Sequence, residues 1–193
     1  MSFPDISVNE PITEGHLRLW CECFGDDRAT AAAFFAISGI DRLTLHVGNF
    51  PKPCGILNMV PVGCENVKGA YIYGVGVSPE MRGQGFFRLM MNYAENFAVR
   101  KELGFLCLIP ADEKLACTYK SFGYTVKVSR YGTAPEDGKS IIYSDNAGFS
   151  AFAAPVSGEH ANTELCGYGL LKPVNKSIAG MSGFAFGSFM GEF

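Results

Sequence analysis

The apolar positions at the start of the chain recur with the period of an α-helix. Four of them fall three or four residues apart and so share one face of a helix: Leu17, Trp20, Cys21 and Phe24. Thr13 can cap this helix and Gly25 can end it. A second, shorter helix is predicted to begin at Asp26 or Asp27, either of which can serve as its N-cap, and to reach about Ile37.

Beyond Gly39 the pattern changes to the two-residue period of a strand. Three strands are predicted in succession, at residues 43–47, 55–62 and 71–77. Short turns join them, so an antiparallel meander is the simplest arrangement.

A long helix is predicted next, from Gly83 or Gln84 to Lys101. Its buried stripe is expected to contain Phe86, Met90, Tyr93 or Ala94, and Phe97. A short apolar strand follows at residues 105–109. A strand, a helical crossover and another strand imply that the two strands pair in parallel.

Another helix is predicted between Asp112, a plausible N-cap, and Gly123, a plausible stop, and a strand follows at residues 124–131. Residues 132–140 are polar and read as a loop. Strand-like pieces separated by Gly and Ser fill the remainder: residues 141–143, 149–154, 165–174 and 184–189. We therefore divide the chain into a core, residues 1–131, and a C-terminal extension, residues 132–193, which packs on the sheet or extends it.

Composition narrows the class of protein. With 193 residues and 48% hydrophobic positions, the chain can build one core without a metal or a disulfide. The net charge of -3 argues against a nucleic-acid partner and against an anionic membrane surface. Seven Cys, an odd number, without His at zinc spacing, are typical of small buried side chains in a reducing cytosol, so we expect no metal site.

The ends of the chain carry no membrane signal in this interpretation. The first residues lack a basic flank and an apolar stretch, so we expect no signal peptide. Residues 178–190 are apolar but shorter than the roughly 20 residues that a membrane span needs. A cytoplasmic location is the prediction.

The turn Arg82-Gly83-Gln84-Gly85 is the strongest candidate for chemistry. It joins a predicted strand to the N-terminus of the long helix, where free N–H groups and the helix dipole favour an anion. Glycines let the backbone approach a ligand, and Arg82 adds a forked positive charge. The spacing matches neither a Walker A loop nor a dinucleotide fingerprint.

Two motifs at a suitable separation resemble the GNAT family of N-acetyltransferases. The first, which resembles motif A, is Val75-Gly76-Val77-Ser78-Pro79-Glu80-Met81-Arg82-Gly83-Gln84-Gly85. The second is an apolar strand at residues 105–109, followed by a helix that carries Tyr119 four residues before Gly123. The resemblance covers about residues 12–131. It implies an α+β fold with a mixed, mostly antiparallel sheet, flanked by helices and splayed at the central strands.

The resemblance also implies which residues bind acetyl-CoA, the co-substrate of the family. Backbone groups of Val75 and Val77 would pair with the pantetheine arm, and Gly74 and Gly76 fit the close approach of another backbone, or alternatively a bulge. The residues that would surround the pyrophosphate are Arg82, Gly83, Gln84, Gly85, Phe86 and Phe87. Two positions depart from the family pattern: Phe87 stands where Gly or Ala is usual, and Asp112 where Asn is frequent.

The reaction implied is direct transfer of an acetyl group to a primary amine, with Tyr119 as the acid that protonates the leaving thiolate. The general base is not identified by the sequence. The candidates are a water chain, the terminal carboxylate of Phe193, or one of the side chains Glu22, His46, Glu65 and Glu80.

Alternatives remain open at this stage. A non-catalytic CoA-binding or regulatory module would bind the coenzyme without turnover, and a purely structural domain would not bind it. The acceptor is expected to be a small-molecule or peptide amine. Phe184, Phe186 and Phe189 could form the seam of a homodimer, or a strand buried in its own subunit.

Overall fold

The structure is a computed structural model that describes residues 3–48, 52–129, 140–153, 168–178, 181 and 183–186. The chain divides into two units, each built from two stretches of sequence. The first comprises Met1–Val60 and Ile72–Phe97, and the second comprises Pro61–Tyr71 and Ala98–Phe193. Two strands, β3 (Gly55–Cys64) and β4 (Val67–Val77), contribute residues to both units.

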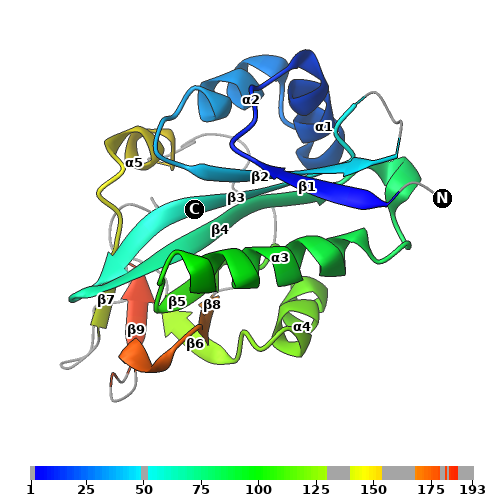
Figure 1. Cartoon of the computed structure of the whole chain (residues 1–193). Coiled ribbons are helices and arrows are strands. Elements are labelled where there is room, and N and C mark those ends of the chain that lie inside the picture. Colours follow the sequence, from blue (N-terminus) through cyan, green and yellow to red (C-terminus); the bar gives the residue numbers. More distant parts are fainter. Residues whose placement is uncertain are drawn as a thin grey trace. The chain divides into compact units, whose positions relative to one another are not determined.

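The first unit contains the predicted meander and an additional edge strand. Besides parts of β3 and β4 it holds β1 (Pro4–Val8), α1 (Glu14–Phe24), α2 (Arg28–Phe35), β2 (Asp41–Val47), the 3-10 turn η1 (Pro79–Met81) and most of α3 (Phe86–Arg100). The strand order is β1-β2-β3-β4, with antiparallel pairing of β1 to β2 and of β2 to β3. Helices α1 and α2 lie on one face of these strands and α3 on the other (Figure 1).

The ends of α1 and α2 follow the signals in the sequence. Thr13 precedes α1, and its backbone N–H donates to Nδ1 of the His16 ring at 3.1 Å. Gly25 ends the helix in the left-handed conformation, with φ 78°. Of the two candidate caps for α2, Asp27 is the one that caps, because its carboxylate accepts from the Thr30 N–H at 2.7 Å. Asp26 instead accepts a hydrogen bond from the Trp20 indole N–H.

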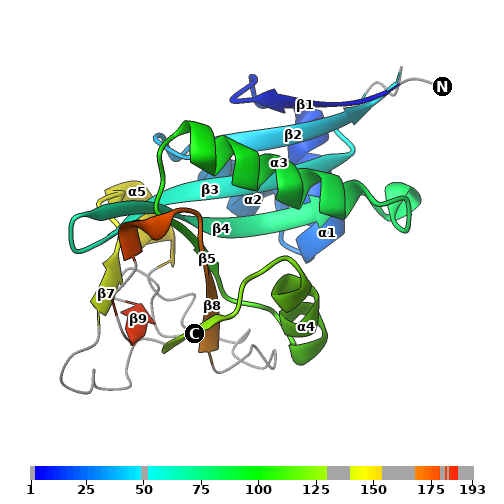
Figure 2. The same cartoon turned by 60° about the horizontal axis from the view of Figure 1, so that its bottom comes forward.

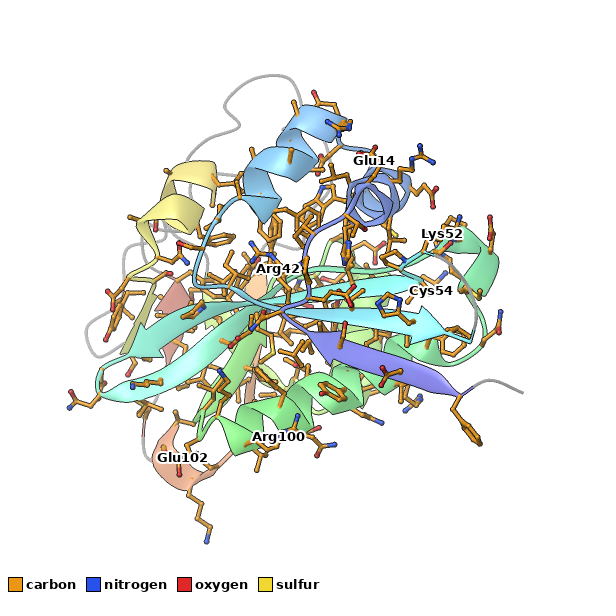
Figure 3. The ribbon with its side chains drawn as sticks, turned by 45° about the horizontal axis from the view of Figure 1, so that its top comes forward. Glu14, Arg42, Lys52, Cys54, Arg100 and Glu102 are labelled. Carbon is orange, nitrogen blue, oxygen red and sulfur yellow. The ribbon has the colours of Figure 1, made fainter. Side chains whose placement is uncertain are left out.

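Arg42 closes the C-terminal end of α2 (Figure 3). Its Nη2 donates to the backbone carbonyls of Phe34, Phe35 and Ile37, at 3.3, 3.3 and 2.6 Å. The guanidinium also lies 5.8 Å from the centre of each of the two Phe rings. A cation at this end complements the helix dipole and binds carbonyls that have no partner within the helix.

The long helix α3 buries most of the predicted stripe, and the structure decides between Tyr93 and Ala94. Met90 and Ala94 are completely buried and Phe97 is 7% exposed, whereas Phe86 and Tyr93 are half-buried. Ala94 is therefore the stripe residue of the pair that the sequence left open. The Met90 sulfur lies so close to Gly55 of β3 that a side chain there would meet it at 2.7 Å.

The second unit contains strands from both halves of the sequence. Its elements are β5 (Phe105–Leu108), α4 (Glu113–Ser121), β6 (Val126–Ser129), β7 (Ser140–Tyr143), α5 (Ala147–Ala153), β8 (Tyr168–Pro173), the 3-10 turn η2 (Lys176–Ile178) and β9 (Phe184–Phe186). The predicted parallel pair is confirmed: residues 69–71 of β4 pair with residues 105–107 of β5. The splay that was expected at these strands, like the domain boundary after residue 131, stays a prediction.

The C-terminal strands pair deep within the sheet of the second unit. β8 runs antiparallel to both β5 and β6 and lies between them, as Figure 2 shows for β5 and β8. β9 pairs in parallel with β6 and with β7. Phe184 and Phe186 of β9 are 4% and 2% exposed, so they are buried within their own chain rather than presented as a dimer seam. Phe189 lies outside the described residues.

Two elements differ from the sequence-based expectation. The strand predicted at residues 149–154 is wrong, because residues 147–153 form helix α5. Asn146 caps it: its side-chain oxygen accepts from the Phe149 N–H at 2.9 Å, and Phe149 and Ala153 then share the buried face. Strand β1 was not predicted, since its short edge begins at a proline and buries little of its surface.

The cysteines are more varied than predicted. Cys54, Cys64 and Cys107 are buried, Cys21 and Cys23 are half-buried, and Cys117 is exposed on α4, against the expectation that all are buried. Cys166 lies outside the described residues.

Candidate functional site

Strand β4 has a left-handed residue shortly before the candidate turn, a conformation typical of a β-bulge. Gly74 has a φ of 60°, a left-handed conformation that glycine adopts without strain. Asn58 of the neighbouring strand β3 holds this bulge: its Nδ2 donates to the carbonyls of Tyr73 and Gly74 at 3.1 and 3.3 Å. A side chain at position 74 would meet the Trp20 ring of α1 at 2.8 Å.

Gly76 is also a contact point for α1. A side chain there would meet the Cys23 sulfur at 2.8 Å and the Phe24 ring at 3.2 Å. The close approach that the glycines of β4 permit is therefore that of α1 side chains on this face of the strand. The prediction that backbone groups of Val75 and Val77 pair with a ligand concerns the edge of the strand, which these contacts leave unaffected.

The end of β4 is tied to the candidate turn by Arg82. Its Nε donates to the carbonyl of Val77 at 3.1 Å, and the Cys23 thiol donates to the same oxygen at 3.6 Å. The following N–H, that of Ser78, donates to the Cys54 carbonyl of the segment that leads into β3. Because a trans peptide points its C=O and N–H in opposite directions, the Val77 carbonyl faces away from Cys54.

Burial dominates the chemistry of Cys23. It raises the pKa of the thiol, although the neighbouring guanidinium of Arg82 partly opposes this shift. The thiol therefore stays protonated near neutral pH and serves as a hydrogen-bond donor to the strand end.

The turn itself is open. Gly83 and Gly85 have φ of 77° and 83°, and a side chain at either position would have nothing within 4 Å. Glycine is thus required by the backbone conformation alone, and not by a neighbouring residue. Gln84 between them is exposed, and its side chain donates to the Glu80 carbonyl at 3.5 Å. Next to the turn, the buried Ser78 hydroxyl has no hydrogen-bond partner among the described residues.

Helix α3 begins directly after the turn. The Leu89 N–H donates to the Gly85 carbonyl at 3.0 Å, which makes Gly85 the residue on which the first helical turn closes. A helix N-terminus carries partial positive charge, and its first N–H groups have no acceptor within the helix. Phe86 and Phe87 are half-buried at this end. The structure thus brings the predicted residues from Val75 to Phe87 together in the first unit as a strand end, an open turn and a helix start.

Tyr119 belongs to the second unit, on α4. It is 8% exposed and packs edge-on against Tyr124, with ring centres 5.9 Å apart. The predicted cap of its helix is confirmed, since the Asp112 carboxylate accepts from the Leu115 N–H at 2.6 Å. Burial raises the pKa of Tyr119 to about 12, so the hydroxyl keeps its proton at neutral pH.

The four side chains considered as general bases have different surroundings. His46 contacts the Glu10 carboxylate at 2.9 Å, and the Glu65 carboxylate accepts from the Ser140 hydroxyl at 2.9 Å. Glu80 lies 3.9 Å from Lys52, and Glu22 is exposed on α1. Phe193 lies outside the described residues.

Sequence reasoning considered Asp26 only as a possible N-cap of the second helix. The indole N–H of Trp20 donates to its Oδ2 at 2.7 Å, beside the bulge of β4. Burial, and secondly the charge of Asp26, raise the pKa of the nearby Tyr73 to about 12. The pair Asp26-Asp27 was the available signal, because a helix needs only one N-cap and the second carboxylate then needs another explanation.

Residues 56–127 match the family profile described as an acetyltransferase (GNAT) domain. This match covers the bulged strand, the open turn and the helices on either side of β5. The matched segment is therefore similar to a GNAT acetyltransferase domain, and the match supports an acyl-CoA-dependent N-acyltransferase. No curated protein matches the sequence significantly.

Solved structures support the GNAT fold. A GNAT family N-acetyltransferase (YhbS) from Escherichia coli in complex with CoA matches with a TM-score of 0.67 at 14% identity, over 100% of this chain and 94% of its own. A GNAT family acetyltransferase from Elizabethkingia anophelis with acetyl-CoA bound has a TM-score of 0.54 at 13% identity, over 87% and 95%. An IAA acetyltransferase from Bacillus cereus has 0.51 at 11%, over 88% and 99%. At these identities the likeness concerns the fold.

Two absences hold for the part of the chain that the structure describes. None of its helices combines the length and the apolar character needed to cross a membrane. Among the same residues, no cluster of three or more His, Cys, Asp or Glu side chains is arranged to hold a metal ion.

Proposed function

We propose that this protein transfers an acetyl group from acetyl-CoA to a primary amine of a small-molecule or peptide acceptor, by direct attack and without a covalent enzyme intermediate. The observation that carries the proposal is the open glycine turn at the N-terminus of α3. A side chain at either of its two left-handed glycines would have nothing within 4 Å, and this open space would leave backbone N–H groups accessible to an anion.

The turn suits the pyrophosphate of the coenzyme. Backbone groups of Gly83 to Phe87 would surround it at the positive end of α3, and the Arg82 guanidinium would bind its oxygens. The pantetheine arm would then run back along the edge of β4, past Val77 and Val75. At present Arg82 occupies the Val77 carbonyl, so a pantetheine N–H that bonds this oxygen would release the guanidinium toward the phosphates.

The chemistry proposed for the acyl transfer needs two proton movements. The neutral amine attacks the thioester carbonyl, a C–N bond forms, the C–S bond breaks, and the amine loses a proton to a base. Tyr119 is proposed to protonate the departing thiolate. Its pKa of about 12 means that it holds a proton to donate at neutral pH.

Thermal unfolding with and without acetyl-CoA tests the proposal. Ligand at 100 times its dissociation constant stabilises the native state by about 2.7 kcal/mol. Arg82→Glu should abolish the shift, because it places negative charge beside the pyrophosphate and removes the guanidinium. Tyr119→Phe should retain the shift but lower the rate of amine acetylation, measured as thiol release.

The absence of a shift in the wild type at millimolar acetyl-CoA would contradict the proposal. A shift in Arg82→Glu equal to that of the wild type would show that the coenzyme binds elsewhere. A normal shift with no thiol release for any amine would favour the non-catalytic CoA-binding module instead.

A further inference from the structure

Most carboxylates around α1 and α2 have an evident partner. Glu14 pairs with Arg28 at 2.7 Å and approaches Arg18 at 3.8 Å (Figure 3 labels Glu14). Glu10 contacts the rings of two histidines, and Asp27 caps α2. These groups are therefore explained by the fold.

Asp26 is different. The Trp20 indole N–H donates to its carboxylate at 2.7 Å, and within the described part of the chain no Lys, Arg or His nitrogen lies within 4 Å of the carboxylate. An ionised carboxylate offers about four acceptor positions, of which Trp20 uses one. The side chain is half-buried, so it is partly withdrawn from water without a compensating cation.

The position of Asp26 relates it to the bulge of β4. Trp20, its donor, packs against Gly74 and lies 6.0 Å from the Tyr73 ring between centroids. The loop remains open on its outer side, since a side chain at Gly25 would have nothing within 4 Å. The carboxylate is thus fixed by the N–H of the same indole whose benzo ring meets Gly74, its charge acts on Tyr73, and it is reachable from solvent.

The proposed path of the coenzyme also leads to Tyr73 and Gly74. If the pyrophosphate occupies the turn at residues 82–87 and the arm runs back past Val77 and Val75, its acyl end arrives next at Tyr73 and Gly74. An amine that attacks the acyl carbon must approach this part of the strand. A carboxylate without a cation is suited to attract an ammonium group there.

We propose that Asp26, held by Trp20 beside the bulge of β4, is the anchor that binds the ammonium group of a cationic amine acceptor. This inference rests on the proposed function for the identity of the site as an acceptor site. It names a specificity-determining residue and narrows the acceptor to amines that arrive positively charged, in preference to neutral or acidic nucleophiles.

Trp20 provides the readout, because it is the single tryptophan of the chain and its indole contacts the carboxylate. The probe is 1,4-diaminobutane, with n-butanol as the uncharged control, each titrated while tryptophan fluorescence is followed. One charge-assisted contact supports affinity on the order of millimolar, so the titration extends to about 50 mM. We expect a saturable change in the wild type that high salt weakens.

Asp26→Asn is the decisive variant, because it removes the charge and keeps an oxygen for the indole. It should lose the saturable response, and raise the KM for the amine tenfold or more with the KM for acetyl-CoA unchanged. Asp27→Asn is the matched control: Asn caps a helix as well as Asp, so response and KM should stay at wild-type values. Trp20→Phe keeps the ring, removes the donor and should raise the amine KM by a smaller factor.

The outcomes separate this inference from the proposed function. A wild type without a saturable response to the diamine, or an Asp26→Asn variant that keeps the response and an amine KM within twofold of wild type, would overturn the anchor. An Asp26-dependent response without any acetyl-CoA shift would support the anchor and contradict the proposed function. Unfolding midpoints of all three variants near that of the wild type exclude misfolding as the cause.

Discussion

Two pairs of glycines a few residues apart have opposite surroundings. Gly74 and Gly76 in β4 face α1 so closely that any side chain would meet Trp20, Cys23 or Phe24. Gly83 and Gly85 in the turn face nothing within 4 Å. The first pair is required because a neighbour takes the space, and the second because the backbone adopts a left-handed conformation in the open.

The difference separates packing from binding within one motif. A glycine that a neighbour requires contributes to the stability of the fold, and its loss should reduce the free energy of unfolding. A glycine with empty space around it contributes little packing. Its value lies in the exposed backbone, so its loss should affect a ligand more than the fold. Four substitutions to alanine test this contrast.

Gly74→Ala should have the largest effect on stability. The left-handed backbone costs a non-glycine residue about 1–2 kcal/mol, and overpacking against Trp20 adds about 1–3 kcal/mol. Urea unfolding should therefore show a loss of about 2–5 kcal/mol. Gly25→Ala is the control, since φ is 78° there and the space is empty, and it should show the backbone cost alone. Equal losses in both variants would remove Trp20 from the explanation.

Gly76→Ala should come second. Its φ is outside the left-handed range, so the new methyl group is opposed only by packing, against Cys23 at 2.8–2.9 Å and the Phe24 ring at 3.2 Å. A loss of about 1–3 kcal/mol is expected from overpacking. The same unfolding experiment measures it, and a variant as stable as the wild type would show that α1 can move away from β4 at little cost.

Gly83→Ala and Gly85→Ala should be the mildest for the fold and the most harmful for the coenzyme. Each should lose about 1–2 kcal/mol of unfolding free energy, because only the backbone opposes a side chain. Calorimetric titration should show acetyl-CoA binding at least tenfold weaker, whereas Gly25→Ala, with the same backbone cost, should bind it normally. Unchanged affinity in both turn variants would break the contrast between the two glycine pairs.

Local signals in the sequence were sufficient for most elements. Thr13 and Gly25 bound α1, and Asp112 caps α4, because caps depend on residues within one turn of the helix. The prediction of a strand at residues 149–154 also relied on local signals, but it was wrong. The cap at Asn146 was present, but small residues and two phenylalanines gave a pattern that fits either a strand or a short helix.

The candidate site was predictable only where it is continuous in sequence. The turn from Arg82 to Phe87 is one segment, so its glycines and helix start could be recognised together. The contact of Cys23 with the Val77 carbonyl, and the place of Asp26 near Trp20 and Tyr73, depend on how α1 packs on β4. Such contacts join residues that no local pattern links.

The position of β8 between β5 and β6 has a consequence for how the chain is made. During synthesis β5 and β6 emerge long before β8. Until β8 is made, the edge of each strand that will pair with β8 carries unpaired backbone groups. The second unit can close its sheet only by a late, long-range step, which is slow and leaves strand edges open to self-association. A ribosome-bound chain that stops short of residue 168 should therefore depend on a chaperone, and its release should depend on the arrival of a single strand.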